Sequence, residues 1–157
     1  MSKLPDKARL DFLYRRGEGA IGRREWALAS LPPTFVLIVT TLIWLAIMPR
    51  DARNLSQGLL DLGVAARYSY LIVYAFVVIL CAVAQYFVSA KRFADLGRPA
   101  ALAGAAPFAI FFAAAATWYE PHSEGWAPHW LTLAIDVVAV GVVIWTIAEL
   151  GFVKGRS

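Results

Sequence analysis

The sequence predicts an all-α membrane protein, a bundle of four transmembrane helices with a short amphipathic helix at the membrane surface between the first two. Composition is the first observation. Of the 157 residues, 60% are apolar and 17% are charged, against about 45–50% and about 25% in soluble domains. The second observation is that the apolar residues form four stretches, at about 26–48, 68–90, 99–118 and 128–152. Each stretch has the ~20 residues that a helix needs to cross ~30 Å of hydrocarbon.

The spans and their short loops take up nearly all of the sequence, so we expect one domain. Residues 26–153 would form this four-helix transmembrane domain. A charged segment, 1–25, comes before it, and a short tail, 154–157, follows it.

The first part of the chain predicts one short helix and one interrupted helix. Residues 3–16 carry a weak apolar stripe at helical spacing, which predicts a short surface helix. Gly17 and Gly19 would end that helix. In the first span, Pro32 and Pro33 remove two backbone donors, so we expect the helix to kink or restart there.

Residues 51–67, between the first two spans, predict the amphipathic surface helix. Their apolar members recur at helical spacing on one side, as Leu55, Leu59, Leu62 and Ala66. We expect this helix to lie on the outer membrane surface.

The third span contains a ladder of small residues. Every fourth residue is an alanine, at Ala101, Ala105, Ala109 and Ala113. Small side chains at this spacing let two helices approach closely in lipid, so the ladder predicts a helix-packing face. Pro107 lies within the ladder and should bend this helix.

Positive charge is distributed unequally between the two ends of the predicted spans. Twelve of the 15 Lys and Arg residues lie in the N-terminal segment, the loop after the second span and the C-terminal tail. The other three lie in the loop after the first span. The positive-inside rule therefore places both termini in the cytoplasm. Because the net charge of +4 flanks apolar spans, anionic lipid headgroups are the expected partners rather than nucleic acid.

Asp136 is the most unusual residue of the spans, because it lies about two turns into the fourth stretch. A carboxylate at the centre of a transmembrane helix costs ~2.5–3.5 kcal/mol, so it normally faces protein or water. One interpretation is a proton or ion relay, or a polar contact to a partner subunit. The other is a structural carboxyl that is protonated or hydrogen-bonded. For Glu149 we expect an interfacial ion pair, and for Gln85 an interhelical hydrogen bond.

The sequence contains none of the common catalytic or nucleotide-binding motifs. His122, Glu124 and His129 share one loop, but they lack the spacing of a zinc site on a helix. We therefore expect no enzyme activity, no metal and no cofactor.

Two charged motifs border the spans on the expected cytoplasmic side. Residues 19–26 read Gly-Ala-Ile-Gly-Arg-Arg-Glu-Trp, and residues 91–98 read Lys-Arg-Phe-Ala-Asp-Leu-Gly-Arg. Together they predict a basic rim that either binds anionic headgroups or is held together by arginine–carboxylate pairs. The candidate functional or contact residues of this rim are Arg23, Arg24, Glu25, Arg92, Asp95 and Arg98.

These motifs resemble those of the family called domain of unknown function 805, which are small bacterial inner-membrane proteins. The matching residues are Gly19, Arg23, Glu25 and Trp26 in the first motif, and Arg92, Asp95, Gly97 and Arg98 in the second. Ala94 stands where that family has a histidine, and residues 151–155 look like the start of its Gly-rich tail. The resemblance implies a four-helix fold in a bacterial inner membrane and no assigned reaction.

The sequence therefore favours an accessory or interaction subunit of a membrane assembly. Its partners would be membrane lipids, together with another membrane protein or further copies of the chain. The alternative is a small transporter or channel that uses Asp136 as its proton or ion relay. A third hypothesis is a lipid-handling protein that uses the basic rim.

Overall fold

The protein is all-helical in the residues that the structure, a computed structural model, describes: 7–47, 62–123 and 125–156. Four of its helical segments are long and apolar enough to span a membrane, which confirms the fold class expected from composition. The elements are α1 (Lys7–Arg15), α2 (Arg23–Ile47), α3 (Leu62–Asp95), η1 (Ala100–Gly104), α4 (Ala105–Tyr119), η2 (Glu120–His122) and α5 (His129–Phe152).

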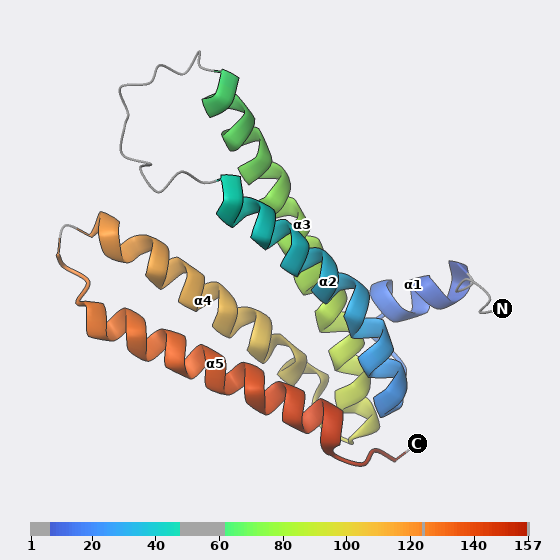
Figure 1. Cartoon of the computed structure of the whole chain (residues 1–157). Helices are drawn as coiled ribbons and strands as arrows, with labels where there is room; N and C mark the ends of the chain where they lie inside the picture. The colour runs from blue at the N-terminus through green and yellow to red at the C-terminus, as the bar shows by residue number, and fades with distance from the viewer. Residues whose placement is uncertain (1–6, 48–61, 124, 157) are drawn as a thin grey trace.

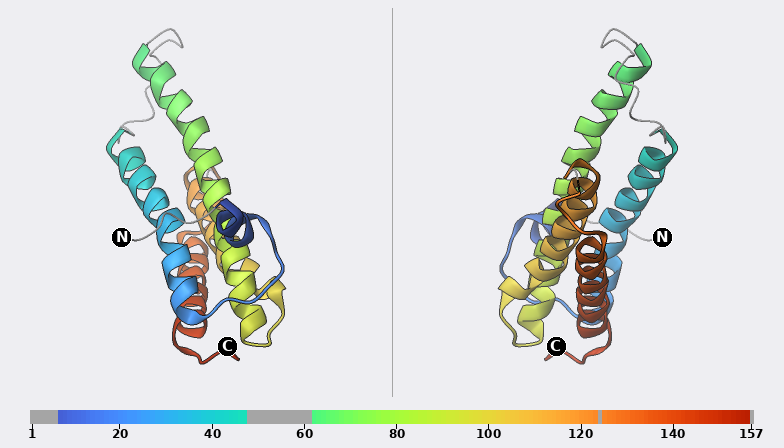
Figure 2. Two further views of the ribbon diagram at one scale, coloured as in Figure 1. Left: turned by 90° about the vertical axis from the view of Figure 1, so that its right-hand side faces the viewer. Right: turned by 90° about the vertical axis from the view of Figure 1, so that its left-hand side faces the viewer.

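Two helical hairpins, α2 with α3 and α4 with α5, make up the membrane-spanning part (Figure 1). The hairpins meet where α2 begins and α3 and α5 end, at the bottom of both views in Figure 2, and they diverge toward their other ends (Figure 1). We call the meeting point the closed end and the opposite side the open end. The four spans thus form a wedge, and contacts between the two hairpins are concentrated at the closed end.

The short helix α1 lies across the α2–α3 hairpin near the closed end (Figure 1). It ends before Gly17, as the sequence predicted. The Tyr14 hydroxyl donates a hydrogen bond of 2.8 Å to the Ala29 carbonyl of α2. That carbonyl lacks its usual helical donor, because the residue four positions on is Pro33, which has no N–H. The Tyr14 bond therefore compensates a proline, and burial raises the pKa of this hydroxyl, which keeps it protonated as a donor.

Helix α2 continues through Pro32 and Pro33 from Arg23 to Ile47, so it does not restart at the prolines. On the facing helix, the Gln85 side chain donates to the Ser30 carbonyl (3.0 Å) and to Thr34 Oγ1 (2.7 Å). These are the interhelical hydrogen bonds expected for Gln85, and they join α3 to the proline-containing turn of α2.

Helix α3 is longer than the second predicted span at both ends, since it covers Leu62–Asp95 rather than 68–90. The surface helix expected at 51–67 lies outside the described residues up to position 61. Residues 62–67 form the first turns of α3 instead. They continue the helix because three of them, Ala65, Ala66 and Arg67, have high helix propensity.

The third span consists of two elements, η1 and α4, rather than one helix. Pro107 falls in the first turn of α4, where its missing N–H has no helical acceptor to lose. The change of helical geometry therefore comes before it, after Gly104. Of the alanine ladder, Ala101 is exposed in η1, whereas the other three are half-buried along α4. Those three are Ala105, Ala109 and Ala113.

The buried core lies at the closed end, in two clusters. One joins α1, α2 and α3, and the other joins α3, η1 and α5. Trp26 packs against both clusters, and its indole Nε1 lies 3.4 Å from Ser89 Oγ. Phe93 and Leu150 are fully buried in the second cluster, and each such side chain stabilises the fold by about 1.5–3 kcal/mol. This packing holds the charged motifs in fixed positions.

Candidate functional site

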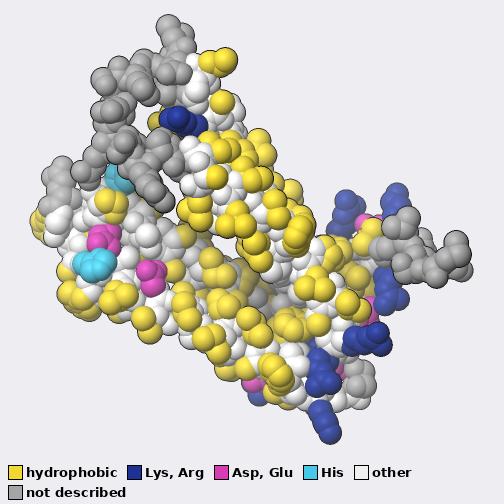
Figure 3. Space-filling view, viewed as in Figure 1, with side chains coloured by type: hydrophobic (Ala, Val, Ile, Leu, Met, Phe, Trp, Pro, Cys, Tyr) yellow, Lys and Arg dark blue, Asp and Glu magenta, His cyan; other side chains and the backbone are white. Residues whose placement is uncertain are grey.

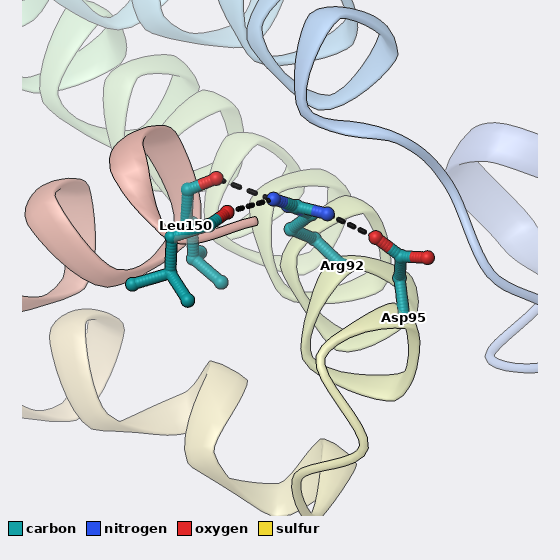
Figure 4. Close-up of polar contacts among 4 residues, drawn as sticks. Arg92, Asp95 and Leu150 are labelled. Carbon is teal, nitrogen blue, oxygen red and sulfur yellow. Dashed lines mark hydrogen bonds and ion pairs between the residues drawn. The ribbon is translucent and has the colours of Figure 1, made fainter. Parts of the chain in front are cut away.

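Arg92 is the centre of the closed end, where it caps the last turn of α5. It is buried, with 1% of its surface exposed. Its Nε donates to the Leu150 carbonyl (3.0 Å) and its Nη2 to the Val153 carbonyl (2.6 Å) (Figure 4). The last carbonyls of a helix lack internal donors and carry the negative end of the helix dipole. The guanidinium supplies both the missing donors and a positive charge for the dipole, so its role at this position is structural.

Asp95 completes this cap by neutralising Arg92. Its carboxylate accepts a hydrogen bond from Arg92 Nη1 within a buried ion pair (Figure 4). The C-terminal tail covers the pair, with Gly155 directly against it. A methyl group at Gly155 would overlap the Asp95 carboxylate. The backbone N–H of Arg156 also donates to the Asp95 carbonyl, at 3.1 Å. The tail therefore packs against the Asp95 side chain and forms a hydrogen bond with its backbone.

Gly97 ends α3 in a Schellman motif, which turns the chain toward η1. Its φ is +71°, in the left-handed region that favours glycine. The Arg98 N–H donates to the Phe93 carbonyl (2.9 Å), and the Gly97 N–H donates to the Ala94 carbonyl (3.0 Å). Arg98 then forms an ion pair of 2.8 Å with Glu149 of α5. This is the interfacial ion pair expected for Glu149.

Lys91 performs for α1 the role that Arg92 performs for α5. It is fully buried, and its Nζ donates to the carbonyls of Leu13 (3.1 Å) and Arg16 at the end of α1. The ammonium also lies 5.1 Å from the centre of the Phe12 ring, within the range of a cation–π contact. Two consecutive cations of α3 thus cap two different helices.

A cavity of about 900 Å³ opens at the closed end between α1, the start of α2 and the C-terminal tail, and we call it the basic cavity. Figure 3 shows Lys and Arg side chains gathered at this end of the molecule. Glu25, the one carboxylate of the lining, pairs with Arg9 at 2.8 Å, which joins α1 to α2. The cations that line the cavity are Arg9, Arg23, Arg24, Arg92 and Lys154.

The rim residues predicted from the sequence therefore divide into two groups. Arg92 and Asp95 are buried and pair internally, and Glu25 and Arg98 each pair with another element. Arg23 and Arg24 remain exposed in the basic cavity. Internal pairing therefore holds for Glu25, Arg92, Asp95 and Arg98. Headgroup binding stays a prediction for the two exposed arginines.

Asp136 lies far from the closed end, in the open half of the α4–α5 hairpin. It is half-buried and borders a cavity of about 400 Å³ whose walls include Ala113, Thr117, Ala139 and Val140. Among the described residues, no hydrogen bond or ion pair reaches its carboxyl. The Thr117 hydroxyl is the other polar group that lines this cavity, and the remaining lining is apolar.

Sequence reasoning did not identify Lys91 as a helix cap, nor Tyr14 as the donor that compensates a proline. Periodicity carries no signal for such contacts, because their carbonyl acceptors are present in every residue. The one available signal was the position of two adjacent cations at the end of a span.

Comparisons of the chain with protein-family models, with curated proteins and with solved structures gave no match.

Proposed function

We propose that this protein is a non-catalytic accessory or interaction subunit of an assembly in the bacterial inner membrane. The observation that carries the proposal is the wedge. The hairpins are fastened to each other at the closed end, and their apolar walls diverge from there (Figures 1 and 3). In the most apolar 18-residue window of each span, only 6% to 17% of the residues are buried. A wedge of this kind offers apolar surface to the helices of a partner.

The charge distribution supports cytoplasmic termini. The closed end gathers nearly all the described Lys and Arg residues, whereas the described cation of the open end is Arg67. The positive-inside rule places such an end in the cytoplasm. The partner surface would then face the hydrocarbon and the outer leaflet.

The residues that resemble the domain of unknown function 805 family have structural roles that fit this proposal. These residues build the closed end: Arg92 and Asp95 form the cap, Gly97 forms the turn, and Trp26 joins the two core clusters. In this chain the matching residues thus have structural roles, as expected of a non-catalytic subunit.

Photo-crosslinking in intact membranes tests the proposal. A crosslinking amino acid would replace Phe76 of α3 or Phe111 of α4, both of which are exposed. The matched control is Phe152, which is exposed at the closed end. We expect one protein adduct, a partner or a second copy, from the first two positions only. Lipid adducts alone at every position, together with a stable monomer in mild detergent, would contradict an interaction subunit.

A proton or ion relay through Asp136 is the second candidate, and one observation favours it: a half-buried carboxyl in an apolar cavity. The other polar groups of the spans do not extend this site. Gln85 is bonded to α2 in the other hairpin, and Glu149 is paired with Arg98. Flux of protons or cations into liposomes that disappears in Asp136→Asn would favour the relay over the accessory subunit.

A further inference from the structure

The basic cavity combines an apolar wall with cations that pair with no carboxylate among the described residues. Of its lining cations, Arg9 is paired with Glu25, and Arg92 is paired with Asp95. No ion pair joins the other three to a carboxylate in the part of the chain that the structure describes. These three are Arg23, Arg24 and Lys154. The cavity therefore keeps about three positive charges that no described carboxylate neutralises.

The apolar wall extends from these cations toward the hydrocarbon. Leu28 and Pro32 continue the same side of α2, and Leu10 faces them from α1. Leu28 is 59% exposed and Leu10 is 40% exposed. From Arg23 to Pro32 the helix rises ~13 Å, at ~1.5 Å per residue. The cavity thus begins at the depth of headgroups and ends at the depth of acyl chains.

We propose that the basic cavity binds one anionic phospholipid from the leaflet at the closed end. The lipid phosphate lies among Arg23, Arg24 and Lys154, where charge-assisted hydrogen bonds are available. An acyl chain lies along Leu28 and Pro32. A volume of about 900 Å³ is within the range of ligand pockets, about 300–1,000 Å³. Lys91 and Arg92 take no part, since both are buried and hold carbonyls of α1 and α5.

This assignment differs from a general attraction between basic residues and anionic lipid. General attraction depends on the number of cations near the surface, at about 1 kcal/mol for each. The affinity of a defined site depends instead on which cations are removed. The chain offers a matched pair of double variants for this comparison: Arg23→Gln with Arg24→Gln inside the cavity, and Arg15→Gln with Arg16→Gln outside it. Both remove two adjacent exposed arginines from the same end.

Native mass spectrometry of the detergent-solubilised protein with added phosphatidylglycerol provides the measurement. We expect one tightly bound lipid per chain, with phosphatidylcholine bound more weakly. The cavity double variant should lower phosphatidylglycerol affinity about 10- to 30-fold, whereas the outer double variant should change it less than about threefold. Equal losses in the two variants would overturn the site and leave only surface attraction.

Two further arms distinguish the source of the phosphate and the role of the apolar wall. Soluble glycerol 3-phosphate should not displace the lipid, and displacement at low millimolar concentration would identify a site for a free anion instead. Leu28→Gln should weaken lipid binding while all cations remain, and unchanged binding would overturn the acyl-chain part of the site. Circular dichroism checks that each variant is folded. Because the purified chain is used without a partner, the result is independent of the accessory-subunit proposal.

Discussion

Replacing Arg92 by methionine tests whether the closed end depends on a buried cation. Methionine keeps the length and apolar stem of the side chain but removes the guanidinium. The carbonyls of Leu150 and Val153 then lose their donors, and the Asp95 carboxylate, in a residue that is 3% exposed, loses its cation.

The magnitude follows from that burial. Removing one partner of a buried ion pair costs about 3–5 kcal/mol, because the remaining charge is left without compensation. The two carbonyls, which lose bonds worth about 1 kcal/mol each, favour the upper part of this range. Adding Asp95→Asn to the Arg92→Met protein should recover about 1–3 kcal/mol, because the buried carboxylate that has lost Arg92 is then replaced by a neutral amide.

Unfolding in mixed detergent micelles with increasing dodecyl sulfate, followed by circular dichroism and tryptophan fluorescence, measures these free energies. Arg98→Met is the matched control, since this arginine also forms an ion pair, with Glu149, but its side chain is 45% exposed. We expect it to cost less than Arg92→Met, because the half-exposed arginine leaves a route for water to Glu149, whose own side chain is 12% exposed. The reasoning is refuted if Arg92→Met costs less than 1 kcal/mol or no more than Arg98→Met.

Three other variants test neighbouring parts of the fold. Gly155→Ala should destabilise the protein by about 1–3 kcal/mol, because the methyl group overlaps the buried carboxylate. The control Gly141→Ala, whose methyl group meets no atom within 4 Å, should be neutral or stabilising by up to about 1 kcal/mol. Unfolding in dodecyl sulfate compares the two variants. Acetylation of the folded protein should modify Lys154 but spare the fully buried Lys91, as peptide mass spectrometry would show. Tyr14→Phe should cost about 1 kcal/mol. The Tyr14 contribution should be constant below pH ~10 and decline above it, because burial raises the pKa of this hydroxyl and the folded state favours its neutral form; unfolding midpoints measured against pH would show this.

Contrary outcomes are equally specific. Equal midpoints for the two glycine variants would mean that the tail does not cover the ion pair. Rapid acetylation of Lys91 would mean that α1 separates readily from α3. A Tyr14→Phe protein with an unchanged alkaline profile would show that the hydroxyl is accessible to water.

The amino-acid sequence by itself determined that the chain is suited to lipid rather than water, and how many membrane-spanning helices it has. Transfer of a segment into lipid depends on the summed hydrophobicity of adjacent residues, which is local information. The charge asymmetry and the end of α1 before Gly17 also depend on adjacent residues, so both were accessible from the sequence. Position-specific signals were less complete, since the alanine ladder gave three half-buried residues of α4 but could not show that Ala101 lies exposed in η1.

Only the tertiary structure decided what each charged residue does. Lys91 and Arg92 are neighbours in the chain, yet one caps α1 and the other caps α5, through hydrogen bonds to residues 78 and 58 positions away. Arg23 and Arg24 have the same chemistry but remain open to a cavity. The role of a cation depends on which carbonyls, carboxylates and apolar surfaces surround it. That environment is created by the packing of distant segments, and no local pattern encodes it.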